Sequence, residues 1–388
     1  MNDSPLRPAG SFAALPAAIT SEFPQAADVY YLNHAAVAPW PQRTRDAVCR
    51  FADENLRQGA RDYPGWLAVQ ARLRAQLCQL INAPDAADIA LLKNTSEGLS
   101  LIAAGLGWHA GDEIIISNQE FPSNRIPWQA LAQRGVRTIV VDISGDAPEQ
   151  ALIDALTPRT RLLSISSVQY GTGLRMDLTR LGEACRDNGT LFCVDAIQTL
   201  GALPFDARAC HADFVVADGH KWMLGPEGLA LFYCRAPVRE QLALTQYGWH
   251  MVEDAGNYDR DDWAPAASAR RFECGSPNML TIHALSASLS LLLEVGMEHV
   301  GEALLARSGY LDQRLRESGR GRVISPASDT RRSGIVTWQP DRETPAAAYA
   351  RLQAAGVVCA QRAGGIRLSP HFYTDQSVID RAVDLLLA

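Results

Sequence analysis

The chain has 388 residues, of which 47% are hydrophobic and 20% are charged, and its formal net charge is −7. A chain of this length can bury the cores of two domains. Because the arginines are scattered over an acidic chain, we expect no concentrated basic face and therefore no nucleic-acid partner. No basic start is followed by a long apolar run, so we expect no export signal, no membrane span and a cytoplasmic protein.

Eight cysteines are spread along the chain, at positions 49, 78, 185, 193, 210, 234, 274 and 359. They form no C-x-x-C motif and no spacing with histidine that is typical of zinc ligands. We therefore expect reduced and mostly buried thiols, with neither a disulfide framework nor a metal site.

Helical and strand patterns alternate through the first part of the chain. The sequence predicts one or two amphipathic helices over residues 43–82, then a short strand and a helix start in IALLKNTSEGLSLIAAGL. Short apolar or β-branched runs predict strands at residues 114–117, 138–142, 161–166, 190–195, 214–217 and 228–233. Apolar strands separated by helices are typical of a mostly parallel sheet flanked by helices, an α/β fold. In such sheets ligands bind beyond the carboxyl ends of the strands.

The pattern changes after the last of these strands. Residues 240–275 show no clear period, and a long helical stretch is expected over residues 280–315. Strands are then expected at residues 322–324, 334–338, 356–360 and 365–369, with helices around 344–355 and 375–387. We predict an N-terminal segment at 1–29, a large domain at 30–263 and a smaller C-terminal α+β domain at 264–388.

Only two of the 36 Lys and Arg residues are lysines, Lys93 and Lys221. A lysine amine, unlike a guanidinium, can lose its proton and condense with an aldehyde to form an imine. Lys221 lies in the turn Asp218-Gly219-His220-Lys221, directly after the strand expected at 214–217. This strand-end position favours a chemical role, and a surface lysine is the alternative interpretation.

Three other polar motifs follow expected strands. Asn94-Thr95-Ser96-Glu97-Gly98 begins a helix, where free N–H groups and hydroxyls favour a phosphate, with a simple capping box as the alternative. Phe121 can cover a planar ligand or pack in the core. Asp195 ends a strand, so it can pair with a protonated ring nitrogen or cap the next helix.

Together these motifs supply a phosphate site, an aromatic platform, a carboxylate and an imine-forming lysine on successive strand ends. Pyridoxal 5′-phosphate needs this set, because its phosphate, its ring, its pyridine nitrogen and its aldehyde are each held by one of them. The sequence therefore predicts a pyridoxal-phosphate site.

Seven motifs also carry a family resemblance: YLNHAAVAPWP, KNTSEGLS, EFPSNRIPW, VDAIQTLG, DGHKWMLGPEG, RRFECGSPN and GGIRLSPHFYT. They resemble the class V aminotransferase and cysteine desulfurase group of fold-type I pyridoxal-phosphate enzymes, over about residues 30–380. The resemblance implies that Lys221 binds the cofactor and moves the proton between Cα and C4′. It also implies that Asp195 pairs with the pyridine nitrogen and that Gln198 contacts the phenolic oxygen.

The same resemblance implies that Phe121 stacks on the cofactor ring. Three residues are expected to hold the phosphate, namely Thr95, Ser96 and His220. Ser276 is expected to reach the phosphate of a partner subunit, in a homodimer with shared active sites. Arg367 matches the family arginine that grips the substrate α-carboxylate, a task that suits a planar guanidinium.

Some positions depart from the desulfurase pattern. Residues 361–366, where desulfurases carry a nucleophilic cysteine, contain none, and Cys359 lies in the preceding apolar strand. Persulfide chemistry is therefore disfavoured. Asp218 stands where many relatives place Ser or Thr on the phosphate, and Tyr170 stands where desulfurases have Asn.

We therefore expect an enzyme that acts on a small amino acid through an external aldimine, with an aminotransferase as the first hypothesis. A C–S or other β-lyase, a selenocysteine lyase and an amino-acid epimerase are alternatives, because they share the first half-reaction. A non-catalytic protein that keeps the pyridoxal-phosphate fold is an alternative of a different class. A place at the pocket mouth and a structural role are equally favoured alternatives for six residues, namely His34, Tyr170, Trp249, His250, Arg362 and His371.

Overall fold

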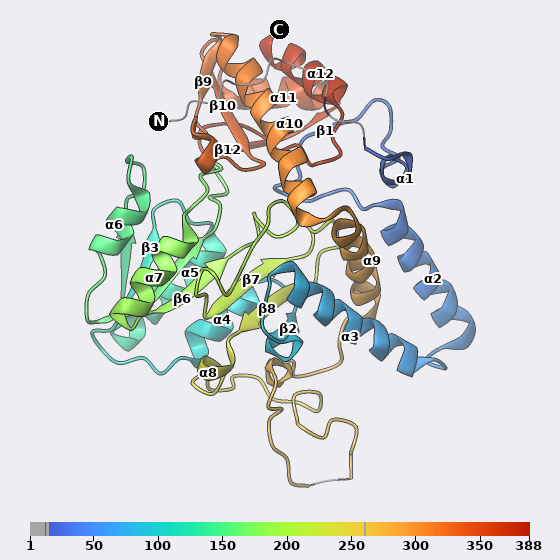
Figure 1. Ribbon diagram of the computed structural model, residues 1–388, viewed down its shortest axis with the longest axis vertical. Coiled ribbons are helices and arrows are strands. Elements are labelled where there is room, and N and C mark those ends of the chain that lie inside the picture. Colours follow the sequence, from blue (N-terminus) through green and yellow to red (C-terminus); the bar gives the residue numbers. More distant parts are fainter. Residues whose placement is uncertain (1–11, 13–14, 260) are drawn as a thin grey trace.

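The computed structural model describes residues 12, 15–259 and 261–388 and places a large sheet below a smaller one (Figure 1). The large sheet has seven strands in the order β2-β8-β7-β6-β5-β3-β4. Its strands are β2 (Ile89–Leu92), β3 (Glu113–Ser117), β4 (Arg137–Val141), β5 (Thr160–Ser166), β6 (Leu191–Asp195), β7 (Phe214–Asp218) and β8 (Ala230–Cys234). Only β8 runs antiparallel to its neighbours within this sheet. The predicted mostly parallel α/β sheet is confirmed.

Helices cover both faces of the large sheet. One face packs on α3 (Tyr63–Leu80), α7 (Leu178–Asn188) and α9 (Met279–Val295), and the other on α4 (Thr95–Gly105), α5 (Ile126–Ala130) and α8 (Ala236–Arg239). Side chains alternate along each strand, so Val215 and Ala217 of β7 join the first core while Phe214 and Val216 join the second. This two-sided burial explains why the strands are apolar throughout.

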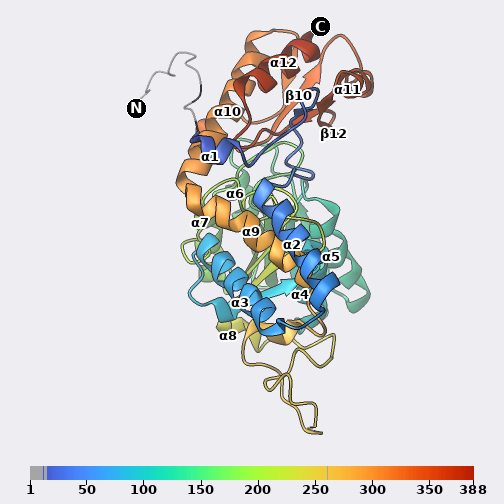
Figure 2. The ribbon, with the colours of Figure 1, turned by 90° about the vertical axis from the view of Figure 1, so that its right-hand side faces the viewer.

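Two of the expected helical regions are each divided at a glycine. The stretch at 43–82 forms α2 (Gln42–Gln58) and α3, with Gly59 at φ 58° between them. The stretch at 280–315 forms α9 and α10 (Met297–Glu317), which are bent by 84° around Gly296 at φ 86°. A left-handed backbone of this kind ends a helix and favours glycine. Figure 2 shows α2, α3 and α9 side by side.

No single helix among the described residues has the length and apolarity of a membrane span, and α9 with α10 would qualify only as a sharply bent pair.

The small sheet has four antiparallel strands in the order β12-β13-β10-β9. These strands are β9 (Gly321–Val323), β10 (Val336–Pro340), β12 (Ala360–Arg362) and β13 (Gly365–Leu368). One face of the sheet packs on α10, α11 (Pro345–Ala354) and α12 (Gln376–Leu387). The strand expected at 356–360 is divided, because β11 (Val357–Val358) leaves the sheet to pair with β1 (Tyr30–Tyr31).

Two chain segments cross the predicted domain limits. Helix α9 lies after residue 263 but packs on α2 and α3, and β1 lies in the large-domain range but pairs with β11. The division into 1–29, 30–263 and 264–388 therefore stays a prediction. Of the N-terminal segment, residues 1–11 and 13–14 lie outside the described residues, and the remainder contains α1 (Ala17–Thr20).

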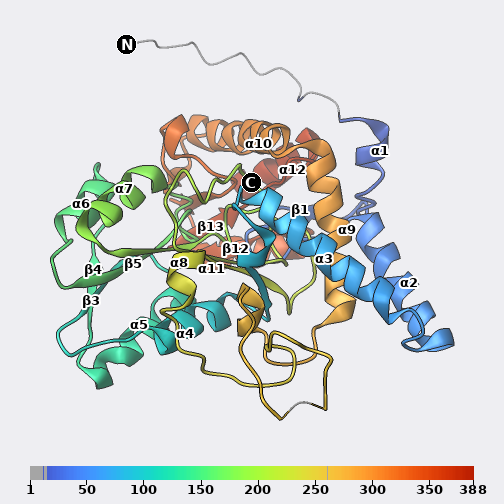
Figure 3. The ribbon, with the colours of Figure 1, turned by 60° about the horizontal axis from the view of Figure 1, so that its bottom comes forward.

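Two further features complete the fold. Helix α6 (Pro148–Asp154) packs beside α7. The segment between α8 and α9 protrudes from the large sheet on the side away from the small domain, as Figures 1 and 3 show.

Candidate functional site

The predicted site residues gather at one edge of the large sheet, beneath the small sheet. Asp195 is the last residue of β6, and Asp218 is the last residue of β7. Thr95 begins α4 directly after β2, and Phe121 precedes the short helix η2 (Pro122–Asn124) that follows β3. The small sheet adds Arg367 from β13, whose guanidinium donates from Nη1 to the Tyr170 carbonyl at 2.9 Å. The topology thus brings these separated motifs together around Lys221, and this cluster of side chains is called the Lys221 pocket.

Lys221 presents a partly buried amine in this pocket. Its Nζ lies 5.8 Å from the centroid of the Phe121 ring. Burial, with a smaller contribution from the Arg367 charge, lowers the pKa of Lys221 to about 8, although the charges of Asp195 and Asp218 act in the opposite direction. A useful fraction of the amine is therefore neutral and nucleophilic near neutral pH.

Asp195 is a buried carboxylate with few local donors. Its Oδ1 accepts from the Ile197 N–H at 3.1 Å, so it supports the turn after β6 as well as facing the pocket. Burial, with a smaller contribution from the Glu120 charge, raises the pKa of Asp195 to about 7, although the Ile197 N–H and the Lys221 charge act against this shift. A protonated ring nitrogen placed beside Asp195 would favour its ionised form.

Glu120 was given no role from the sequence, yet it organises the loop that carries Phe121. Its buried carboxylate accepts from Ser117 Oγ at 2.8 Å, Asn124 Nδ2 at 2.8 Å and Gln169 Nε2 at 3.0 Å. It also accepts from the N–H of Ser166 at the end of β5. Glu120 therefore joins the ends of β3 and β5. A single acidic residue after a predicted strand does not indicate such a network.

The start of α4 leaves polar groups available for an anion. Asn94 caps the helix by accepting from the Glu97 N–H at 2.8 Å, so the capping box does not use the Thr95 or Ser96 hydroxyl. Thr95 Oγ1 is buried and has no hydrogen-bond partner in the described part of the chain. Ser96 Oγ lies 2.8 Å from Ser123 Oγ. An unpaired buried hydroxyl at a helix N-terminus is what a phosphate would satisfy.

Asp218 is hydrogen-bonded to the start of α4, next to the candidate phosphate position. Its Oδ1 accepts from the Thr95 N–H at 2.8 Å, so the carboxylate braces the start of α4. Burial raises the pKa of Asp218 to about 6. His220 lies beside it, with Nδ1 3.6 Å from Asp218 Oδ2, and burial together with the Lys221 charge lowers the pKa of His220 to about 4. His220 is therefore neutral near pH 7 and can donate an N–H.

Gln198 links three parts of the site. Its Nε2 donates to the Ala35 carbonyl at 3.1 Å, and its Oε1 accepts from Trp222 Nε1 at 2.8 Å. One amide N–H of Gln198 is left without an acceptor among the residues that the structure describes. That N–H is available for a phenolic oxygen.

Arg367 is a buried cation without a counterion. It is 2% exposed, its Nε has no hydrogen-bond partner, and it forms no ion pair within the described ranges. Burial lowers the pKa of Arg367 to about 10, and the nearby Arg362 charge adds to this effect. An uncompensated buried charge is costly, so this position is suited to an anionic ligand. Above it, Tyr170 meets the Phe121 ring edge-on, with centroids 5.1 Å apart.

Ser276 is the one predicted cofactor residue that does not lie in this pocket. It is exposed and lines a different cavity, of about 360 Å³, together with Lys93, Glu97 and Gly228. Its expected role toward a partner subunit is not tested by a single chain and stays a prediction.

Two of the expected pocket-mouth residues are instead buried between the domains. His34 hydrogen-bonds through Nε2 to the Tyr373 hydroxyl at 2.7 Å, and His371 through Nε2 to the Trp222 carbonyl at 3.1 Å. Burial lowers the pKa of His34 to about 4. Of the two alternatives, both histidines therefore take the structural role, because their rings are buried and hydrogen-bonded within the fold.

The other four expected mouth residues lie in two different parts of the structure. Trp249 and His250 lie in the protruding segment, where His250 Nδ1 is 3.7 Å from Glu273. Tyr170 and Arg362 do lie near Lys221, on the edge of the pocket.

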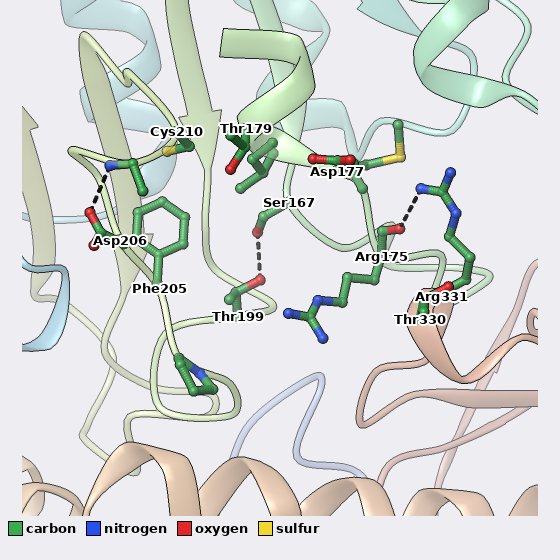
Figure 4. Close-up of a pocket in the computed structure, with 14 residues that line it drawn as sticks. Ser167, Arg175, Asp177, Thr179, Thr199, Phe205, Asp206, Cys210, Thr330 and Arg331 are labelled. Carbon is green, nitrogen blue, oxygen red and sulfur yellow. Dashed lines mark hydrogen bonds between the residues drawn. The ribbon is translucent and has the colours of Figure 1, made fainter. Parts of the chain in front are cut away.

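Another cavity, of about 520 Å³, is lined by Ser167, Thr199 and Arg331 (Figure 4). Ser167 lines it and lies 2.6 Å from Thr199 Oγ1, while its hydroxyl also reaches the Asp195 carbonyl at 3.2 Å. Arg331, which lies across the cavity from Ser167 in Figure 4, forms an ion pair with Glu149. Because Lys221 does not line this cavity, we do not assign it to the chemistry. Across the described ranges, no three His, Cys, Asp or Glu side chains gather as a metal site.

The family described as Aminotransferase class-V matches residues 30–381. The chain belongs to this family. Among curated relatives, a probable cysteine desulfurase of Methanothermobacter thermautotrophicus is 30% identical over 288 residues, which cover 73% of this chain and 71% of the relative. An uncharacterized aminotransferase of Bacillus subtilis is 28% identical over 316 residues, which cover 81% of this chain and 82% of the relative.

Solved structures show the same architecture. The cystine C–S lyase C-DES, in complex with its product cysteine persulfide, matches with a TM-score of 0.86 at 25% identity, over 93% of this chain and 98% of that chain. This class V chain is therefore a fold-type I enzyme, and its cofactor is pyridoxal phosphate. The pocket fits that group, because it offers a buried unpaired hydroxyl at Thr95, a buried carboxylate at Asp195 and a desolvated amine at Lys221.

Replacing Asp195 by Asn should leave the cofactor bound and lower kcat by about 10²–10³-fold, because a preorganised charge at the ring would be lost. Cofactor absorbance and steady-state rates of the purified variant measure the two effects. Wild-type turnover in Asp195→Asn would mean that the side chain only supports the turn at Ile197.

Replacing Arg367 by Lys should weaken binding of every α-amino acid by about 10–100-fold, because the charge stays but the two-pronged hydrogen bonding is lost. The cofactor spectrum and the melting temperature should change little. Spectral titration with amino acids gives the affinity, and amines without a carboxylate serve as the control. Unchanged amino-acid affinity would move carboxylate recognition to another group.

Proposed function

We propose that this protein is an aminotransferase that acts on small α-amino acids. The observation that carries the proposal is the juxtaposition of Lys221 with Arg367. One is a desolvated amine with a lowered pKa, and the other is a buried guanidinium that no acidic side chain of the described residues neutralises. An α-amino acid supplies the missing carboxylate to Arg367 and presents its Cα to the amine of Lys221.

Named residues would hold the cofactor from several sides. Thr95, Ser96 and His220 would hold its phosphate, Phe121 would cover its ring, and Asp195 and Gln198 would contact the pyridine nitrogen and the phenolic oxygen. When bound, the cofactor supplies an aldehyde for the substrate amine and a ring that accepts the electrons released at Cα.

Lys221 then acts as the general acid and base. Its neutral amine removes the proton from the substrate Cα and can return it at a neighbouring carbon. Arg367 fixes the carboxylate, so that the Cα–H bond is held toward Nζ. Transamination requires only this one mobile proton carrier, which matches the single accessible amine of the pocket. The two buried histidines, His34 and His371, are held by other hydrogen bonds and have lowered pKa values.

A C–S lyase is the second candidate. It is favoured by the likeness to the cystine C–S lyase C-DES at 25% identity. The same groups would serve, because loss of a thiolate from Cβ follows removal of the Cα proton.

The desulfurase mechanism has less support in the arrangement of thiols. Cys359 is 2% exposed within the small-domain core, and burial raises its pKa to about 11. Such a thiol is a poor nucleophile, since the thiolate is the reactive form. Epimerisation by two bases is also less supported. It needs a second base on the opposite side of the substrate from Lys221, and the histidines His34 and His371 are held by other hydrogen bonds.

We further propose a homodimer in the cytoplasm. Ser276 is exposed and lines a cavity that does not include Lys221, which is consistent with a role at a neighbouring subunit. The protruding segment also exposes aromatic side chains, namely Tyr247, Trp249, Tyr258 and Trp263. Light scattering of the holoenzyme tests the dimer directly.

One parallel assay separates the candidate reactions. The holoenzyme is incubated with a panel of amino acids and a keto-acid acceptor, and new keto acid, sulfide and inverted stereochemistry are measured. Amino-group transfer should dominate. If sulfide is formed from cysteine or cystine instead, the C–S lyase hypothesis replaces the aminotransferase hypothesis. If no amino acid changes the cofactor spectrum, the protein is not catalytic.

Any sulfide release should survive replacement of Cys359 by Ala, because no cysteine occupies residues 361–366. The exposed Cys49 on α2 provides the matched control, as Cys49→Ala. Sulfide assays and thermal melts of both variants are compared. Selective loss of sulfide in Cys359→Ala, with the melting temperature preserved, would restore the persulfide mechanism.

A further inference from the structure

Two arginines share one face of the hairpin that lies over the pocket. In the antiparallel pair β12–β13, Ala360 is opposite Arg367 and Arg362 is opposite Gly365. Opposite residues point to the same face and side chains alternate along a strand, so Arg362 and Arg367 are diagonal neighbours on that face. Ile366 points the other way, into the small-domain core.

This face of the hairpin is turned toward the large domain. Arg367 donates to the Tyr170 carbonyl at 2.9 Å, and its opposite neighbour on β10, Thr337, donates to the Gly171 carbonyl at 2.7 Å. The hairpin tip is also close to this loop, because a Cβ added to Gly171 would lie 3.1 Å from Ala363 Cβ. Arg362 directly precedes that tip, so its guanidinium can reach the mouth of the Lys221 pocket.

The turn after Arg362 is held in a conformation that most residues avoid. Ala363 has φ 49° and Gly364 has φ 76°, a pair of left-handed residues that matches a tight two-residue hairpin. For a residue with a side chain this region is uncommon and is frequently found at functional positions. The tight turn limits how far Arg362 can move from Arg367.

The charge of Arg362 is not balanced locally. Its Nη1 donates only to the neighbouring Gln361 carbonyl, and it forms no ion pair in the part of the chain that the structure describes. Its charge acts on both Lys221 and Arg367, since it lowers the pKa of each. One substrate carboxylate can neutralise Arg367, and a second cation then remains at the pocket mouth.

We propose that Arg362 recognises a carboxylate on the substrate side chain, so that the preferred substrates are acidic α-amino acids such as aspartate or glutamate. This inference rests on the proposed function and names its substrate class. A guanidinium forms strong, directional hydrogen bonds with a carboxylate, and Arg367 would hold the α-carboxylate while Arg362 holds the distal one. Arg362 is exposed, so discrimination arises from the charge-assisted hydrogen bonds that a distal carboxylate makes with it and that a neutral amide makes more weakly.

The test compares acidic substrates with their neutral isosteres. Values of kcat/KM are measured for aspartate against asparagine and for glutamate against glutamine, using the holoenzyme and Arg362→Gln. The wild type should prefer an acid over its amide by about 10–100-fold, the range expected for one hydrogen-bonded charge pair, and Arg362→Gln should remove that preference. Arg322→Gln, an exposed arginine on β9 of the same sheet, should retain it.

A binding measurement complements the rates. Spectral titration with 2-methylaspartate, which has no Cα proton to lose, should show an affinity loss of the same size in Arg362→Gln. The inference is overturned if the wild type prefers amides. It is also overturned if the variant weakens acids and amides equally, because Arg362 would then share the α-carboxylate. If no amino acid of either class alters the cofactor spectrum, the proposed function fails together with it.

Discussion

The site depends on one constraint: charged side chains are buried in it without full neutralisation by opposite charges nearby. Strand ends place Asp195 and Asp218 near the Lys221 amine, and the small sheet adds Arg367. The carboxylates favour the ammonium form, while burial and the arginine favour the neutral amine. The pKa of Lys221 is therefore lowered to about 8, where one group can serve as nucleophile, base and acid. Without the small sheet, the Arg367 charge that favours the neutral amine would be missing.

Three groups of the site would each be satisfied by a different group of the cofactor or substrate. Among the described residues, Asp195 accepts from the Ile197 N–H and forms no ion pair, Arg367 lacks an anion, and Thr95 has an unsatisfied hydroxyl. A pyridinium, an α-carboxylate and a phosphate would satisfy these three groups in turn. Because a protein uses folding free energy to keep such groups buried and unsatisfied, their joint occurrence indicates a binding site rather than a structural network. Glu120 shows the contrast, since all its bonds are made within the protein.

Much of this arrangement could be predicted from sequence, for identifiable reasons. Buried parallel strands are apolar on both faces, so β3 to β8 stood out, and residues at their ends had to meet at one edge. The Glu120 network and the bonds of Gln198 to Ala35 and Trp222 could not be predicted, because they depend on which distant loops meet. The sequence could not decide between a structural and a pocket-mouth role for His34 and His371 for the same reason, since burial between domains leaves no mark on a single histidine. The break at Gly296 was visible only as a glycine in a long helical pattern.

The central claim is that Lys221 carries the cofactor. The chain has only one other lysine, Lys93, which is exposed and paired with Glu97 at 3.1 Å, so the claim has a simple internal control. The purified holoenzyme is reduced with borohydride, digested and analysed by mass spectrometry, alongside Lys221→Arg and Lys93→Arg. The account predicts a pyridoxyl adduct on Lys221 in the wild type and in Lys93→Arg, and none in Lys221→Arg. An adduct on Lys93, or one that survives in Lys221→Arg, would contradict it.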